Sequence, residues 1–294
     1  MLNNRKNINL IKQEAKETEK SVTLQPKNDS MQNILVPIGS TESAQNNLQY
    51  AIDFANEIQA NIFVFRAYSS LSKAGTIINV DSIIERETNL YLKTLVNAVD
   101  TKNVEVKMIS AKGSVIESVH SIEEEIGIDL IIIGAKSNSI REEIYLGKTA
   151  GSLVKQTEIP MLVVPENYKY QPVKTILMAF RSGIVSKKAA LKPLHFFVQT
   201  FHPTVDLLLV KTPDYTEEDL VLDKELEKVK NTLTITENTT TYMGVLEHLN
   251  SFNPDILCVF RRKRGFFRKL WEKSTIQKSE FYANMPLLIL KGKK

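Results

Sequence analysis

The chain has 294 residues, of which 43% are apolar and 24% charged, and its formal net charge is +4. This length can bury two ordinary hydrophobic cores, and so mild a charge does not by itself call for a nucleic-acid partner. No apolar run approaches the roughly 20 residues that span a bilayer, and the N-terminus lacks the apolar stretch of a signal peptide. With its single cysteine, Cys258, read as a core filler, we expect a soluble cytoplasmic protein without a membrane partner.

Residues 1–30 are polar and contain only scattered apolar side chains. No turn or strand pattern ties them to the segment that follows, so we expect them to be disordered. Met31 opens an apolar strand pattern directly. We therefore also expect translation of the native protein to start at Met31 rather than upstream of it.

Strand and helix patterns alternate through residues 31–165. Short apolar runs predict buried strands at 33–38, 61–65, 104–110, 129–133 and 161–164. Helical spacing of apolar residues fills the intervals, at 48–58, 80–99, 115–126 and 150–154. This alternation implies parallel strands joined by right-handed crossovers.

After a linker at 166–173, residues 174–291 repeat the same order of elements. Strands are predicted at 174–180, 205–210, 233–236, 255–260 and 286–290, and helices near 184–200, 216–231 and 240–251. The last two strands begin at Asp129 and Pro160 in the first copy and at Asp255 and Pro286 in the second, 31 residues apart in both. We expect two α/β domains, each a doubly wound, five-stranded parallel sheet.

The loop between the last two strands differs between the copies. In the first copy it runs from Gly134 through Ser137 to Gly147, Lys148 and Thr149. Glycines let the backbone approach a phosphate closely, and such loops lead into helix N-termini at the carboxyl edge of a parallel sheet. The alternative is that Gly134 merely ends a strand and Gly147 merely starts a helix.

Two common phosphate-binding motifs are absent from the first copy. A P-loop ending in Gly147-Lys-Thr149 would need a glycine at position 142, where the chain has Glu142. The first strand–helix turn begins at Gly39 and has no second glycine, so it is not a Rossmann fingerprint.

The pattern Gly134-x2-Ser137-x9-Gly147-Lys148 resembles the Gly-x2-Gly-x9-Gly-(Ser/Thr) loop of the universal stress protein family. The strand sequences at 34–37, 129–134 and 159–164 are similar to that family as well, and the resemblance covers residues 31–290 as a tandem pair. It implies an adenine nucleotide alpha hydrolase-like fold with strand order 3-2-1-4-5. It also implies pairing of the copies through their last strands, as an internal pseudo-dimer.

The resemblance further implies that the loop holds ATP in some members of the family. It places the candidate nucleotide contacts at Gly39, Ala67, Gly134, Ser137, Gly147, Lys148 and Thr149.

The chain departs from the family pattern at the positions that would contact ATP. ATP-binding members carry an Asp just after the first strand, but this chain has Gly39 there, and residues 180–183 of the second copy contain no acid. The three loop glycines are replaced by Phe260, Lys263 and Lys273 in the second copy. We expect at most a weakened ATP site in the first domain and none in the degenerate second domain.

Residues 261–273 of the second copy carry seven basic side chains against one acid, together with three aromatic residues. One interpretation is a weak anion-binding site. Its candidate residues are Arg261, Arg262, Lys263, Arg264 and Ser274. The other interpretation is that the aromatic residues pack on their own domain and the cations form a solvated rim.

No catalytic arrangement is recognisable, and the four histidines show no metal-ligand spacing. The leading hypothesis is a non-enzymatic stress-response or regulatory protein that requires no cofactor and acts through an unidentified protein partner. Tandem chains could pair further as homodimers. The alternatives are a slow ATP-hydrolysing enzyme at the first domain and an anion or nucleic-acid binder at 261–273, with nucleic acid the less favoured ligand.

Overall fold

The structure is a computed structural model that describes residues 31–39, 43–69, 80–135, 147–185, 187–261 and 285–291. The expectations for residues 1–30 lie outside this range. The chain divides into two compact units, Met1–Ile133 and Gly134–Lys294. The last helix and strand of the first repeat therefore belong to the same compact unit as the whole second repeat.

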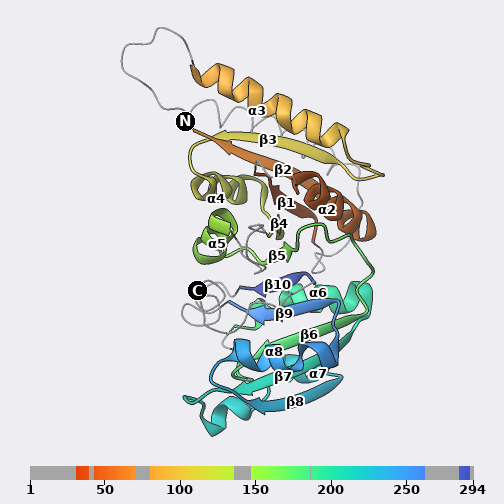
Figure 1. The fold of residues 1–294 in the computed structure, drawn as a ribbon, viewed down its shortest axis with the longest axis vertical. Coiled ribbons are helices and arrows are strands. Elements are labelled where there is room, and N and C mark those ends of the chain that lie inside the picture. The colour runs from red at the N-terminus through yellow and green to blue at the C-terminus, as the bar shows by residue number, and fades with distance from the viewer. Residues whose placement is uncertain are drawn as a thin grey trace. The chain divides into compact units, whose positions relative to one another are not determined.

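The first unit contains a parallel sheet in the order β3-β2-β1-β4. Its strands are β1 (Asn33–Pro37), β2 (Asn61–Tyr68), β3 (Val106–Lys112) and β4 (Leu130–Gly134). Its helices are α2 (Ala44–Ile58), α3 (Val80–Asn97) and α4 (Val115–Ile126). Helix α2 packs on β1 and β2, and α3 packs on β2 and β3, as Figure 1 shows. In β1 the side chains of Ile34, Leu35 and Val36 are completely buried.

Helix α4 illustrates how the sequence sets these elements locally. Ser114 and Glu117 form a capping box: the amide of Glu117 donates to Oγ of Ser114 at 3.2 Å, and the amide of Ser114 donates to Oε2 of Glu117 at 3.4 Å. The apolar stripe places Val119 and Ile122 in the core with no exposed surface. Cap and stripe together orient α4 on its sheet.

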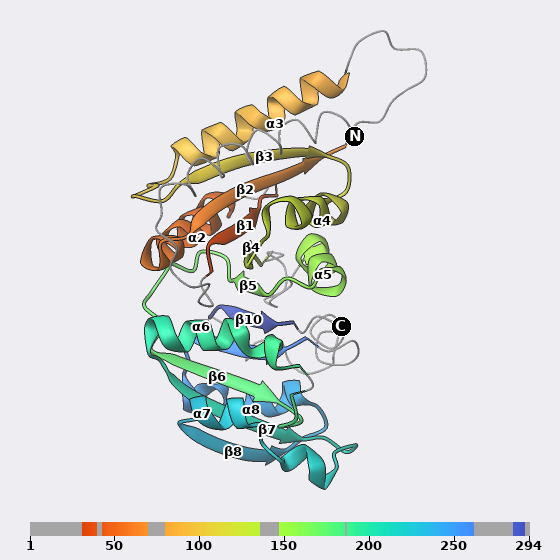
Figure 2. The same cartoon turned by 180° about the vertical axis from the view of Figure 1, so that it is seen from behind.

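The second unit contains a six-stranded sheet in the order β5-β10-β9-β6-β7-β8. Its strands are β5 (Met161–Val164), β6 (Thr175–Phe180), β7 (Thr204–Lys211), β8 (Thr232–Glu237), β9 (Ile256–Phe260) and β10 (Leu287–Leu290). Its helices are α5 (Gly147–Gln156), α6 (Lys192–Phe201), α7 (Lys224–Val229) and α8 (Thr241–Phe252), with 3-10 turns η1 (Lys188–Leu191) and η2 (Glu217–Leu220). Figures 1 and 2 show α8 and α6 on opposite faces of this sheet, as a doubly wound fold requires.

The last strands of the two repeats pair with each other. Strand β5 runs antiparallel to β10, with Leu288 opposite Leu162, whereas β10 with β9, β9 with β6, β6 with β7 and β7 with β8 all pair in parallel. Within the second repeat the order β8-β7-β6-β9-β10 is the predicted order 3-2-1-4-5. This arrangement confirms the expected pairing through the last strand.

The two repeats share hydrogen bonds position for position. Oδ2 of Asp129 accepts the amide of Asn33 at 3.0 Å, and Oδ2 of Asp255 accepts the amide of Thr175 at 2.8 Å. In return, the amide of Asp129 donates to the carbonyl of Asn33 at 3.0 Å, and that of Asp255 donates to the carbonyl of Thr175 at 3.1 Å. The duplication seen in the sequence is thus present in the backbone geometry, and it aligns Asn33 with Thr175.

The predicted helix at 216–231 is wrong. The segment forms η2 and α7, separated by non-helical residues 221–223. The amide of Asp223 donates to the carbonyl of Gly183 at 3.0 Å, and the amide of Gly183 donates to the carbonyl of Asp219 at 2.7 Å. These tertiary bonds interrupt the helix, and local helix propensity carries no information about them.

Cys258 lies on β9, and its side chain is completely buried. Burial raises the pKa of its thiol, because a thiolate would lose its hydration there. The side chain therefore acts as a small apolar core residue, as the sequence predicts.

Candidate functional site

The turn after β1 is held in place by helix α3. Gly39 is exposed, and its carbonyl accepts a hydrogen bond from the hydroxyl of Tyr91 at 3.2 Å. Just before it, the amide of Ile38 donates to the carbonyl of Phe65 at 2.7 Å, so β1 stays bonded to β2 up to the turn. The backbone of the turn after β1 is therefore held by an aromatic side chain.

Arg66 joins this arrangement, although the sequence did not single it out. Its guanidinium carbon lies 4.1 Å from the centre of the Tyr91 ring, a cation–π geometry. Nη1 of Arg66 is buried and has no hydrogen-bond partner among the residues that the structure describes. Ala67 follows in β2, half-buried and in register with Ala111 of β3. Arg66 directly follows the apolar run at 61–65, and this position is the sequence feature from which it could have been predicted.

Helix α5 carries the loop residues that the structure describes. Gly134 ends β4 and Gly147 starts α5, while Ser137 and the side chain of Lys148 lie outside the described residues. Thr149 is exposed in the first turn of the helix. The amide groups of a first helical turn lack acceptors within the helix, and they suit an anion.

The core-facing side of α5 follows the predicted pattern. Ala150, Leu153 and Val154 are all buried, with at most 2% of each side chain exposed. The amide of Ala135 donates to the carbonyl of Val164 at 2.8 Å, so the chain leaves β4 alongside β5. Gly39 and Ala67 lie in the first unit, whereas Gly134 and the residues after it lie in the second.

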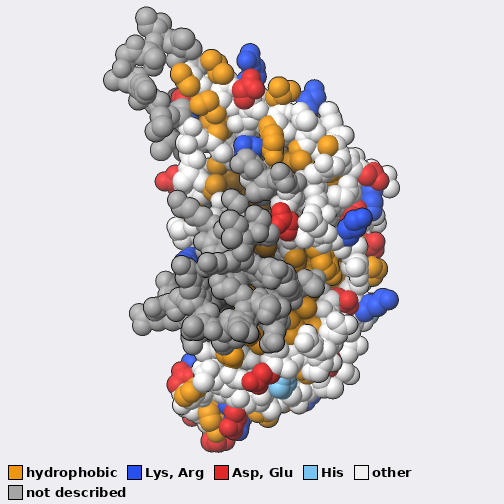
Figure 3. Space-filling view, in the orientation of Figure 1, with side chains coloured by type: hydrophobic (Ala, Val, Ile, Leu, Met, Phe, Trp, Pro, Cys, Tyr) orange, Lys and Arg blue, Asp and Glu red, His pale blue; other side chains and the backbone are white. Residues whose placement is uncertain are grey.

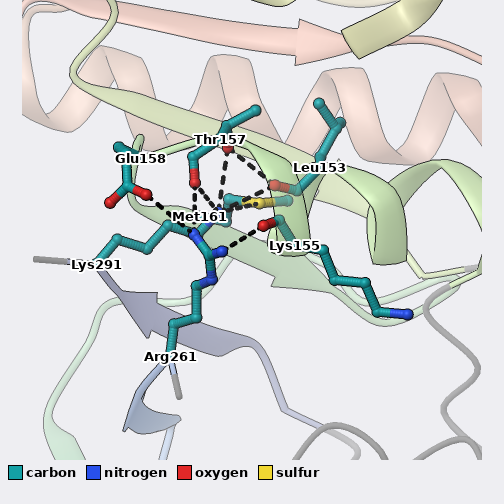
Figure 4. A network of polar contacts seen from close by, with 7 residues as sticks. All are labelled: Leu153, Lys155, Thr157, Glu158, Met161, Arg261 and Lys291. Atoms are coloured by element: carbon teal, nitrogen blue, oxygen red, sulfur yellow. Dashed lines mark hydrogen bonds and ion pairs between the residues drawn. The ribbon is translucent and has the colours of Figure 1, made fainter. Parts of the chain in front are cut away.

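In the second repeat, Arg261 occupies the position of Ala135. The amide of Arg261 donates to the carbonyl of Leu290 at 2.8 Å, which matches the bond from Ala135 to Val164. Its guanidinium donates to the carbonyls of Thr157, at 2.9 Å, and Lys155 (Figure 4). Arg262, Lys263, Arg264 and Ser274, the other candidates for an anion site, lie outside the described residues.

Arg181 occupies the position of Gly39 in the second repeat. Its Nη1 lies 2.6 Å from Oδ2 of Asp214, whose Oδ1 accepts the hydroxyl of Thr212 at 2.6 Å. The Thr212 hydroxyl and the Arg181 guanidinium lower the pKa of Asp214 below its ordinary value of 3.8. An ion pair thus stands after β6, where the first repeat has an uncharged glycine.

Close backbone packing accompanies this ion pair. A Cβ atom added to Gly183 would meet the carbonyl oxygen of Val221, and it would lie 2.9 Å from Cα of Leu222. The segment after β7 therefore fills the space beside the turn after β6. Gly183 therefore has no room for a side chain unless residues 221 and 222 move.

Low pH should destabilise the second repeat through the carboxylates of Asp214 and Asp219, which lie near Arg181. The pKa values of Asp214 and Asp219 are both lowered, Asp219 chiefly by hydrogen bonds from Ser182 and Thr216. A lowered pKa contributes stability above the unfolded value, and this contribution is lost as pH falls through the folded value. We expect the free energy of unfolding, measured by urea denaturation, to fall as the pH drops below the ordinary carboxyl value of 3.8.

Asp214→Asn should flatten that part of the pH profile, whereas Glu218→Gln, which removes a neighbouring exposed carboxylate, should leave its slope unchanged. Equal slopes in wild type and Asp214→Asn would contradict the prediction.

The described residues show neither a membrane-spanning helix nor a metal cluster. None of their helices is long and apolar enough to cross a bilayer. None of their His, Cys, Asp and Glu side chains gather in a group of three or more that could hold a metal ion.

On the face drawn in Figure 3, the coloured Lys and Arg side chains are interspersed with Asp and Glu.

Residues 31–165 match the profile of the universal stress protein family. Within the chain, 81 residues are 31% identical to universal stress protein G of Shigella flexneri and of Escherichia coli O157:H7. This match to the universal stress protein family covers the first repeat. The aligned part is 28% of this chain and spans 56% of the length of these relatives.

Solved structures extend the likeness in fold to both repeats. A universal stress protein from Archaeoglobus fulgidus DSM 4304 is similar with a TM-score of 0.66 at 15% identity, over 88% of this chain and 98% of its own. A putative universal stress protein from Pseudomonas aeruginosa UCBPP-PA14 gives a TM-score of 0.52 at 12% identity, over 90% and 94% of the two chains. The predicted α/β fold of the universal stress proteins is thus confirmed.

Proposed function

We propose that the chain is a cytoplasmic, non-enzymatic stress-response regulator whose first repeat binds the phosphates of ATP. The observation that carries this proposal is the start of α5. Gly134 ends one strand, Gly147 opens the helix, and Thr149 presents an exposed hydroxyl in its first turn. Backbone amides at a helix N-terminus, flanked by glycines at the carboxyl edge of a parallel sheet, are suited to an anionic ligand.

The site is proposed to be weak. The position at which ATP-binding relatives carry an acid is Gly39, which supplies only backbone groups, and its carbonyl already accepts the Tyr91 hydroxyl. Gly39 therefore cannot supply the carboxylate that the family resemblance places at this position. ATP binding then depends mainly on the phosphates.

The second repeat is proposed to bind no nucleotide. Arg261 donates to helix carbonyls, and Gly183 is enclosed by the backbone of residues 221–222. The role of the second repeat would then be structural. Signalling would pass through a protein partner that recognises the first repeat with or without its nucleotide, and tandem chains could associate as homodimers.

Calorimetry with ATP on nucleotide-stripped protein tests this function, with and without Mg²⁺. We expect a Kd on the order of 10–100 µM for wild type. Gly147→Asp should weaken binding by at least about tenfold, because a carboxylate would stand beside the phosphates at the start of α5. Asp is well tolerated in a first helical turn, so the helix itself should persist.

Gly147→Asn is the matched control, since it adds nearly the same volume without the charge. It should weaken binding less than Gly147→Asp. Absence of binding by wild type at millimolar ATP would overturn the proposal. Release of phosphate from ATP and Mg²⁺ that depends on Gly147 would favour the slow ATP-hydrolysing enzyme instead.

A further inference from the structure

The C-terminal end of α5 is capped by a buried lysine from the end of the second repeat. Lys291 is 5% exposed, and its Nζ donates to the carbonyls of Leu153 at 3.1 Å and Thr157 at 3.0 Å. The same atom lies 3.1 Å from Oγ1 of Thr157 and 3.6 Å from Sδ of Met161. Figure 4 shows these groups converging on the lysine. A buried ammonium group needs such partners, because burial without them is costly.

Arg261 caps the same helix end. Its Nη1 donates to the carbonyl of Thr157 at 2.9 Å, so that one oxygen accepts from both cations. Its Nη1 also lies 3.5 Å from the carboxylate of Glu158. Thr157 is completely buried, and its own hydroxyl donates to the carbonyl of Leu153 at 2.9 Å. Three side chains thus bind the last carbonyl groups of α5.

Capping of this kind matters for a helix as short as α5. The last carbonyls of a helix lack partners within it, and they form the negative end of the helix dipole, which cations stabilise. Helix α5 has ten residues, a length that is marginal for an isolated helix. Its order therefore depends on its packing and on its caps.

The two cations have no counterparts in the first repeat. Arg261 follows β9 as Ala135 follows β4, and Lys291 follows β10 as Pro165 follows β5. Neither alanine nor proline offers a side-chain donor. The second repeat thus supplies a cap at positions where the first repeat has none.

We propose that Arg261 and Lys291 are positioning residues through which the second repeat sets the placement of α5, and with it the phosphate-binding turn at Gly147. The inference rests on the proposed function of that turn. The cap and the turn are opposite ends of one helix about 15 Å long. Loosening the last turn should therefore disorder the first turn as well, because helix formation is cooperative.

Hydrogen exchange and ATP calorimetry on the full chain test this role. The variants are Arg261→Gln and Lys291→Met, singly and combined. Arg181→Gln and Lys228→Met are controls that remove more exposed cations elsewhere in the second repeat. For the double variant we expect amides throughout 147–156 to exchange about tenfold faster and ATP to bind about fivefold more weakly.

The controls should match wild type in both measurements, and Arg261→Lys should recover part of the lost ATP affinity, because it keeps the charge without the guanidinium geometry. Faster exchange confined to the last turn, with unchanged ATP affinity, would overturn the inference. If wild type binds no ATP but exchange still rises along all of α5, the nucleotide proposal fails and the positioning role stands. If Lys291→Met does not fold, Arg261→Gln alone decides, since Arg261 lies nearer the surface.

Discussion

Gly183→Ala should lower the free energy of unfolding by about 3 kcal/mol. The added methyl group would clash with backbone atoms of Val221 and Leu222. Backbone atoms cannot move away by a rotamer change as the end of a side chain can. Relief would require moving residues 221–223, and that movement would strain the hydrogen bonds of Gly183 to Asp219 and Asp223. Urea denaturation followed by circular dichroism measures the loss.

Gly244→Ala provides the matched control for Gly183→Ala. A Cβ there would also be crowded, but by the side-chain methyl groups of Val210, which can shift. Gly244 lies within α8, where alanine gains about 1 kcal/mol of helix propensity over glycine. We expect the two effects to offset each other largely. A loss at Gly183 no greater than that at Gly244 would show that the 221–223 segment is not packed as described.

Asp255→Ala should destabilise the second repeat by about 2–3 kcal/mol. Oδ2 of Asp255 accepts the amides of Lys174 and Thr175, both at 2.8 Å, and the Thr175 hydroxyl at 3.1 Å. Removing the carboxylate leaves two amides at the start of β6 without their acceptor. Thermal unfolding should report the loss, and hydrogen exchange should locate it at Lys174 and Thr175.

Asp255→Asn separates the hydrogen bonds from the charge. The amide oxygen of Asn can accept from the same donors, so the cost should be about half that of alanine. Asp129→Ala in the first repeat removes the equivalent bonds to Gln32 and Asn33 and should have a comparable effect. A neutral result for Asp255→Ala would show that water replaces the carboxylate without loss.

The central strands, such as β1 and β9, were predictable because their sequences are nearly continuous apolar runs. The 31-residue interval between the strand patterns at Asp129 and Pro160 recurs between Asp255 and Pro286, and this recurrence predicted the duplication. Asp129 and Asp255 make equivalent hydrogen bonds in the structure. Helix α4 was predictable for a similar reason, since Val119 and Ile122 lie on one helical stripe. Where local pattern and tertiary packing agree, the sequence is sufficient.

The remaining features depend on contacts between residues far apart in the chain. Residues 221–223 leave the helical conformation because they bond to Gly183, a partner that helix propensity cannot identify. Arg261 looked like part of a basic surface, but its donors lie against a helix end more than 100 residues earlier. Lys291 gave no sequence signal of burial, because a lysine near the end of a chain is ordinarily solvated.

Covalent duplication also removes a symmetry constraint. In a homodimer of identical chains, an arginine placed where Arg261 stands would appear in both subunits, and so would the loss of the loop glycines. In the tandem chain, Ala135 and Arg261 can differ, so the first repeat keeps Gly134 and Gly147 while the second contributes cations. Under the proposed function, the ligand stoichiometry would be one nucleotide per chain, half that of a symmetric pair of intact domains.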